Sequence, residues 1–262
     1  MSEEVIRTRI WHEEPEPDNP FAAKTAYCHG YDVYGDMLGR ARWSEMVYLL
    51  FRGEAPAPAE ADLLETLAVA LANPGPRDPS VHAAMCGGTC GSPAASSLMA
   101  ALAVGAGNLS GGREVLAAME GWEACGTDLE AWRGRFANPP QTAISVWPAS
   151  EHPPGFDPHG MAAATPVLQA LERLATLSPG PRLAWLARHR PQLEALAGCP
   201  LAFSGVAAAA FADLGMATEA GEMLYLLLRL PGAAAHALEQ RGYGHKKFPF
   251  FSIEFDMAGE AS

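Results

Sequence analysis

The sequence is poor in residues that favour β-sheet and carries fewer basic than acidic side chains. Tyrosine occurs only 6 times, and isoleucine and threonine are also few, whereas alanine, leucine, glutamate, arginine and methionine are plentiful. Such a mixture favours helix over strand. With 18 Lys and Arg against 30 Asp and Glu, the formal net charge is -12. We therefore expect neither nucleic acid nor an anionic membrane as a partner, although a local basic pocket could still hold a small anion.

Long apolar runs are also missing. The most apolar segment, Met223 to Leu230, is far too short to span a bilayer and is predicted to be a core helix. Met1-Ser2-Glu3-Glu4 has neither a basic start nor an apolar stretch, so we expect no secretory signal. Five scattered cysteines favour reduced thiols and a cytoplasmic protein. Cys86 and Cys90 have no second ligand pair nearby in sequence, so no metal site is expected.

Apolar spacing predicts a succession of short helices. The 26 glycines and 22 prolines fall mostly between the periodic segments, where they end one helix and precede the next. Ser110 is expected to be an N-cap, because it stands just before one of these segments. The expected helices cover about 43–51, 58–71, 92–104, 111–122, 166–177, 181–197, 206–214, 219–230 and 233–241.

Three segments lack helical periodicity. Residues 1–26 are rich in proline and acid and are expected to form an extended surface segment. Residues 138–165 are predicted to be a long loop, and loops of this length in compact proteins are usually functional or hinge-like. The tail at 246–255 alternates enough for one short strand or an extended arm.

Four stretches carry motifs in a fixed order. They are His29–Val33, Trp43–Pro56, Ala106–Val115 and Leu224–Gln240. Together they resemble the citrate synthase superfamily, and most closely its short citryl-CoA lyase-like branch. The resemblance implies an all-α, two-domain subunit that acts as a homodimer. It also implies a large dimerisation domain of residues 1–111 and 206–262, and a small domain of residues 112–205 on the acyl-CoA side.

The resemblance also implies a chemistry for which two side chains are substituted. In the family, a histidine holds the enol oxygen of the thioester and an aspartate removes the α-proton. Ser110 stands at the histidine position and Ser204 at the carboxylate position. A hydroxyl can donate a hydrogen bond, but it cannot shuttle protons as imidazole does or replace a carboxylate base. No Asp or Glu lies between Glu194 and Asp213, so the usual base is predicted to be missing.

Most other candidate site residues come from the same resemblance, whereas Arg188 and Arg190 come from the densest basic cluster of the sequence. Each candidate has an alternative. His159 is the candidate for the family's second histidine, or a solvated loop histidine. Arg229 and His236 are candidates for binding a substrate carboxylate. The alternative for Arg229 is a buried salt bridge, and the alternative for His236 is a histidine packed within a helix. Arg188 and Arg190 are candidates for contacting CoA phosphates, or part of a solvated helix face.

Three functions remain open at this point. The first is an enzyme that forms or cleaves a C–C bond next to an acyl-CoA thioester. The second is a non-catalytic homologue that pairs with a related, active chain as a structural or regulatory partner. The third is another reaction in the same site, such as thioester hydrolysis or retro-Claisen cleavage, in which Ser110, Ser204 or His159 takes a new role.

Overall fold

The computed structural model describes residues 6–140, 152–249 and 251–253 of the chain. The chain divides into two compact units, one of Met1–Ala72 with Ala106–Leu228 and one of Asn73–Gly105 with Arg229–Ser262. Helices dominate the described residues, in which the strands form a single small sheet. The predicted all-α class is therefore confirmed.

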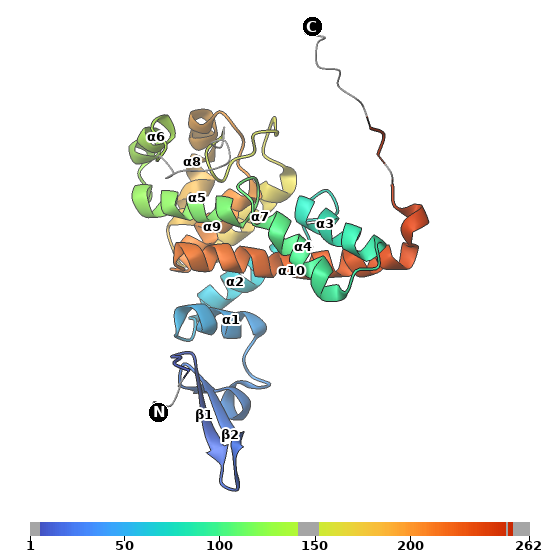
Figure 1. Ribbon diagram of the computed structural model, residues 1–262. Helices are drawn as coiled ribbons and strands as arrows, with labels where there is room; N and C mark the ends of the chain where they lie inside the picture. Colours follow the sequence, from blue (N-terminus) through green and yellow to red (C-terminus); the bar gives the residue numbers. More distant parts are fainter. Residues whose placement is uncertain (1–5, 141–151, 250, 254–262) are drawn as a thin grey trace, which may run out of the picture. The chain divides into compact units, whose positions relative to one another are not determined.

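The first unit begins with a β-hairpin (Figure 1). Strands β1 (Trp11–Glu16), β2 (Asn19–Cys28) and β3 (Tyr31–Asp32) pair antiparallel in that order, and a short π-helix η1 (Val33–Met37) follows. The described part of residues 1–26 is extended and largely exposed, as predicted, but its strands pair in a hairpin, which was not predicted. The hairpin was missed because Pro15 lies at a register shift in β1, where a missing N–H is tolerated.

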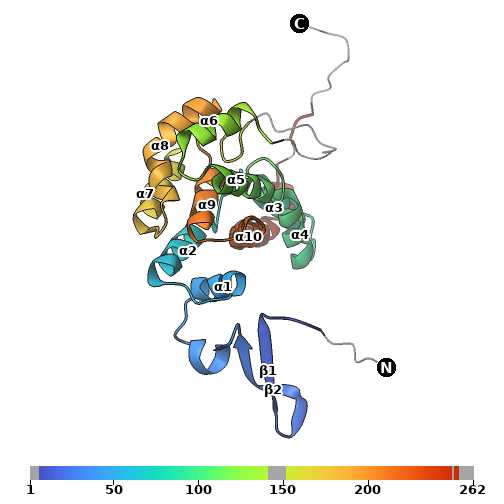
Figure 2. The same ribbon diagram turned by 90° about the vertical axis from the view of Figure 1, so that its left-hand side faces the viewer.

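The core of the first unit is built around one buried helix. In α9 (Phe203–Asp213) all residues from Ser204 to Phe211 are buried. The other helices of the unit are α1 (Trp43–Arg52), α2 (Pro58–Leu71), α5 (Gly112–Cys125), α6 (Leu129–Ala137), α7 (Thr165–Leu177), α8 (Arg182–Ala197) and the first part of α10 (Thr218–Tyr243). Helices α2, α5, α7 and α8 pack against α9 (Figure 2). Four consecutive alanines, residues 207–210, allow this close packing on every side.

The second unit contains α3 (Pro79–Thr89), α4 (Ala94–Gly105), the end of α10 and a short 3-10 helix η2 (His245–Lys247). Helices α3 and α4 pack on one another. A side chain at Gly88 would overlap the carbonyl of Ala237, so only glycine allows α3 to approach α10 there. No group of three His, Cys, Asp or Glu in the described residues is placed to hold a metal ion.

Most predicted helices are confirmed, and the exceptions have physical reasons. Helix α3 was not predicted because Gly87 and Gly88 obscure its periodicity, and α6 because it has no clear apolar face. The two helices expected on either side of Pro231 are one, α10. Leu228 and Ala233 are both buried, so packing before and after the proline outweighs the lost backbone hydrogen bond.

Two further expectations concern the tail and the domains. The tail at 246–255 was expected to form a short strand or an extended arm. In its described part the chain after η2 contains no strand. The predicted small domain, 112–205, lies within the first compact unit together with α9. That division into domains stays a prediction.

Within the described ranges, no helix has the length and apolar character that spanning a bilayer requires.

Candidate functional site

Three stretches that carry candidate site residues, those around Ser110, His159 and Ser204, meet at the carboxylate of Glu114. This residue lies in the first turn of α5 and is 2% exposed. Its Oε1 accepts a hydrogen bond of 2.7 Å from the hydroxyl of Ser204 and one of 2.9 Å from the backbone N–H of Gly155. Its Oε2 accepts a hydrogen bond from the backbone N–H of Ser110. A carboxylate therefore does lie beside Ser204, although it comes from another part of the chain.

The loop around Gly155 is fixed along the start of α9. The N–H of Ala202 donates to the carbonyl of Gly155 at 2.9 Å, and the N–H of Asp157 donates to the carbonyl of Pro200 at 2.8 Å. Gly155 has a φ of +91°, and a Cβ there would lie 2.9 Å from the Cα of Gly205. Glycine is thus required both in the loop, at Gly155, and in α9, at Gly205, where the loop and the helix cross.

The environment of Glu114 opposes its ionisation. Burial is the largest influence and raises the pKa of the Glu114 carboxyl above its usual value. The hydrogen bonds from Ser204, Gly155 and Ser110, together with the charge of the buried His152, lower the same pKa without cancelling the effect of burial.

Ser110 adopts a backbone conformation that is unusual for a residue other than glycine. Its φ is +53°, its carbonyl accepts a hydrogen bond of 3.2 Å from the hydroxyl of Tyr225, and the residue is exposed. The prediction that Ser110 is the N-cap is wrong, because the N-cap of α5 is Gly111. Strained backbone of this kind clusters at functional sites, where surrounding contacts hold it.

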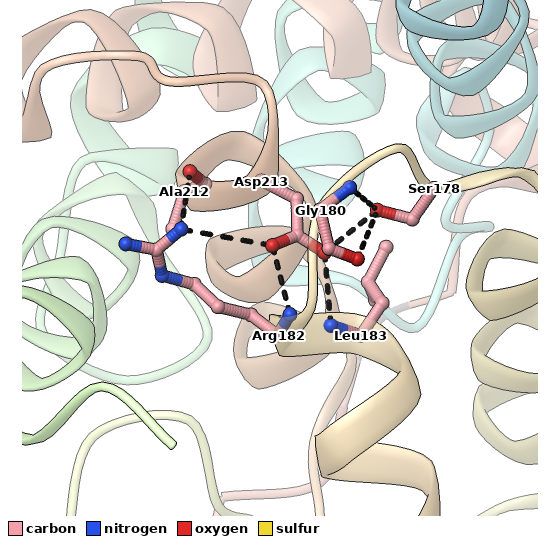
Figure 3. Close-up of polar contacts among 6 residues, drawn as sticks. All are labelled: Ser178, Gly180, Arg182, Leu183, Ala212 and Asp213. Atoms are coloured by element: carbon pink, nitrogen blue, oxygen red, sulfur yellow. Dashed lines mark hydrogen bonds and ion pairs between the residues drawn. The ribbon is translucent and has the colours of Figure 1, made fainter.

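The two carboxylates that flank Ser204 in sequence serve the fold instead, and Figure 3 shows the contacts of one of them, Asp213. Asp213 is fully buried and accepts hydrogen bonds from the N–H groups of Arg182 and Leu183, each 2.9 Å, and from the hydroxyl of Ser178 at 2.7 Å. It thereby caps the start of α8. Glu194 accepts from the N–H of Leu201 at 3.0 Å.

Sequence reasoning missed Glu114 because it searched for the base only near Ser204. A signal was present, since Glu114 is the third residue of a helix after the N-cap Gly111, where glutamate side chains often bend back toward preceding N–H groups.

The other predicted residues of the first unit lie in exposed or self-paired positions. His159 is exposed, and its N–H donates to the carboxylate of Asp157 at 2.9 Å. Arg188 is exposed, and Arg190 forms an ion pair of 2.6 Å with Glu194 on the same helix. These surroundings agree with the alternatives of a solvated loop histidine and a solvated helix face.

The two predicted substrate-binding residues belong to the second unit. Arg229 is buried and forms an ion pair with Asp78, which caps α3 by accepting from the N–H of Ser80 at 2.9 Å. The Nε2 of His236 lies 3.2 Å from the side-chain oxygen of Asn73. The buried salt bridge considered for Arg229 is therefore formed, and its role toward a substrate stays a prediction.

Comparison with known proteins gives no matching family model and no matching curated protein. Among solved structures, citryl-CoA lyase from Hydrogenobacter thermophilus is similar with a TM-score of 0.74 and 17% identity, over 99% of this chain and 97% of that one. ATP citrate lyase from Methanothrix soehngenii, in complex with citrate and coenzyme A, is similar with a TM-score of 0.74 and 18% identity. A mutant of ATP citrate lyase from Methanosaeta concilii, in complex with (3S)-citryl-CoA, is similar with a TM-score of 0.74 and 17% identity.

The matches to the two ATP citrate lyases cover 99% of this chain but only 43% of each ATP citrate lyase chain. Identities this low establish the fold alone. The resemblance predicted from the ordered sequence motifs is confirmed at that level: the chain has the helical, citrate synthase-like fold of citryl-CoA lyase.

Proposed function

We propose that this protein cleaves or forms a C–C bond next to the thioester of an acyl-CoA, with citryl-CoA as the model substrate. The observation that carries the proposal is the meeting of Ser110, Gly155 and Ser204 around the carboxylate of Glu114. It supports the proposal because Ser110 and Ser204 stand at positions that resemble those of the family's catalytic histidine and carboxylate. The similarity in fold to citryl-CoA lyase, over nearly the whole of both chains, adds further support.

The proposed cleavage needs two kinds of group. A base removes the proton of the 3-hydroxyl, the bond between C2 and C3 breaks, and C3 becomes the carbonyl of a 2-oxo acid. The bonding pair stays on C2 as the enolate of the shortened acyl-CoA, which then takes up one proton at carbon. A hydrogen-bond donor must stabilise the negative thioester oxygen while this occurs.

We assign these roles as follows. The exposed Ser110 donates to the thioester oxygen, in place of the family's imidazole. His159 takes the hydroxyl proton and returns it at carbon, since imidazole exchanges protons near neutral pH. For the second unit alone, we propose separately that Arg229 and His236 bind a small carboxylate. Arg188 and Arg190 are the proposed contacts for CoA phosphates, and Arg190 must leave its ion pair with Glu194 to make such a contact.

The assembly and location are also proposals. A homodimer, or a heterodimer with a related chain, in the cytoplasm would suit a protein whose ligand is a small carboxylate or an acyl-CoA. No metal ion is assigned a role in the reaction.

The test combines binding with turnover. Calorimetry measures the binding of CoA, and a thioester assay measures citryl-CoA cleavage by the wild-type protein, Ser110→Ala and the control Ser252→Ala, which changes another exposed serine. We expect CoA binding by all three and cleavage that falls at least tenfold in Ser110→Ala alone. Cleavage at the buffer rate by the wild-type protein, without CoA binding, would refute the proposal.

A specific observation favours the second candidate, a non-catalytic partner of a related chain. Ser204 and Glu114 are 1% and 2% exposed and bond to one another, and Arg229 is paired with Asp78. Groups engaged in this way stabilise a fold without any need for substrate. CoA binding without turnover, together with activity that rises when a related active chain is added, would establish this alternative.

A further inference from the structure

We infer that Glu114 is the positioning residue of the proposed site: its carboxylate holds the backbone of Ser110 in the left-handed conformation and fixes the hydroxyl of Ser204. The inference rests on the proposed function for its consequence in catalysis. Its structural part rests on the contacts of Glu114 alone.

The three hydrogen bonds to Glu114 come from three separate parts of the first unit. The donors are the N–H of Ser110 before α5, the N–H of Gly155 in the loop and the hydroxyl of Ser204 in α9. An ionised carboxylate is an acceptor only and suits three donors at once. Because the side chain is buried, water cannot replace a partner that is lost.

Helix capping by itself does not account for this arrangement. A glutamate at the third position of a helix normally bonds to the N–H of the N-cap, here Gly111. The carboxylate of Glu114 instead reaches the residue before the N-cap, a loop 41 positions away and a helix 90 positions away. What these three partners share is their place in the stretches that carry the candidate residues Ser110, His159 and Ser204.

The contact also redefines the role of Ser204. Its hydroxyl proton is donated to Glu114, so the group is not available as a donor to a substrate. Ser204 therefore holds the carboxylate in place, and the carboxylate in turn holds Ser110. In this chain, order in the site depends on the acceptor oxygens of Glu114, whereas the expected position for a carboxylate was 204.

The test is the isosteric change Glu114→Gln, with Glu120→Gln as the control at an exposed position of the same helix. The amide oxygen of glutamine can still accept from Gly155 and Ser204, but its NH₂ then faces the N–H of Ser110, so two donors oppose each other. We expect hydrogen exchange at the Ser110 amide to speed up by about tenfold or more, while the Gly155 amide stays protected. Glu120→Gln should change neither.

Turnover supplies the second readout. In Glu114→Gln we expect kcat for citryl-CoA cleavage to fall by about tenfold or more with KM within about twofold of the wild-type value, because Ser110 is displaced while substrate contacts elsewhere remain. Unchanged exchange at Ser110 would overturn the inference whatever the activity. Faster exchange in a protein whose wild-type form has no turnover would uphold the positioning role and count against the proposed function.

A measurement on the wild-type protein covers the case in which Glu114→Gln does not fold. The backbone N–H groups of Ser110 and Gly155 donate to the same carboxylate, so their amide resonances must shift with one common pH midpoint. A common midpoint supports the inference, and two different midpoints would overturn it.

Discussion

The hydroxyl of Ser204 donates a hydrogen bond of 2.7 Å to Oε1 of Glu114, across 90 positions of the sequence. This contact ties the first turn of α9 to the first turn of α5. It places a buried carboxyl at a point where the sequence alone indicated only two hydroxyl groups.

The pH dependence of stability should reveal this carboxyl. Burial raises the pKa of Glu114 in the folded protein above the ordinary glutamate value of 4.5, so the folded protein holds this proton more tightly than the unfolded chain. The stabilisation is fully present below pH 4.5 and is lost as the pH rises through the folded pKa. We therefore expect the difference in unfolding free energy between the wild-type protein and Glu114→Gln to decrease as pH rises above 4.5. Urea unfolding at a series of pH values measures it, and a difference that grows with pH would contradict the prediction.

Replacing Ser110 by glycine should separate the cost of its backbone from the use of its side chain. Glycine adopts a φ of +53° without strain, so Ser110→Gly should raise stability by up to about 1 kcal/mol, whereas Ser110→Ala keeps the strain. Thermal unfolding measures both. If Ser110 donates to the thioester, both variants lose cleavage activity even though the glycine variant is the more stable. A glycine variant with full activity would remove the hydroxyl from the mechanism.

The crossing of the loop and α9 should not tolerate a side chain. A Cβ at Gly205 would overlap the carbonyl of Gly155. Gly205→Ala should therefore lower the unfolding free energy by about 1–3 kcal/mol, because the backbone must shift. The control is Gly134→Ala, at an exposed position of α6 where a Cβ would meet nothing within 4 Å. It should be neutral or stabilise by up to about 1 kcal/mol. Equal effects of the two changes would contradict the close approach.

The cap on α8 is a further point of stability (Figure 3). Asp213→Asn replaces one carboxylate oxygen by an NH₂ group that faces buried donors, so we expect a loss of about 2–3 kcal/mol. Arg182→Ala is the milder comparison, since its guanidinium lies 3.7 Å from Asp213 and is partly exposed. That change should cost no more than about 1 kcal/mol. Chemical denaturation of both variants measures the difference.

Tyr48 gives a prediction for alkaline pH. Burial, followed by its hydrogen bond of 2.8 Å to Glu60, raises the pKa of Tyr48 to about 12. The unfolded chain loses this proton near pH 10, so the stabilisation by the phenol is present below pH 10 and is lost as the pH rises toward 12. The difference in stability between the wild-type protein and Tyr48→Phe should therefore shrink between pH 10 and 12. An unchanged difference across that range would contradict a buried phenol.

Local patterns explain which parts of the fold were predictable. The apolar face of α1 and its end at Gly53, which has a φ of +77°, depend on residues within a few positions of one another. The same holds for α2, which starts at Pro58. The hairpin and α6 escaped prediction because their periodicity is weak and their pairing or packing partners decide their form.

The helical class, most helix positions and the resemblance to citryl-CoA lyase were predictable from the sequence, because helix periodicity and motif order are properties of neighbouring residues. Tertiary structure alone decided that Glu114 lies beside Ser204, that Asp213 caps α8, and that Arg229 pairs with Asp78. Each of these pairs is far apart in the chain. A side chain's partner and its burial arise only when distant segments pack together, and burial is also what raises the pKa of Glu114.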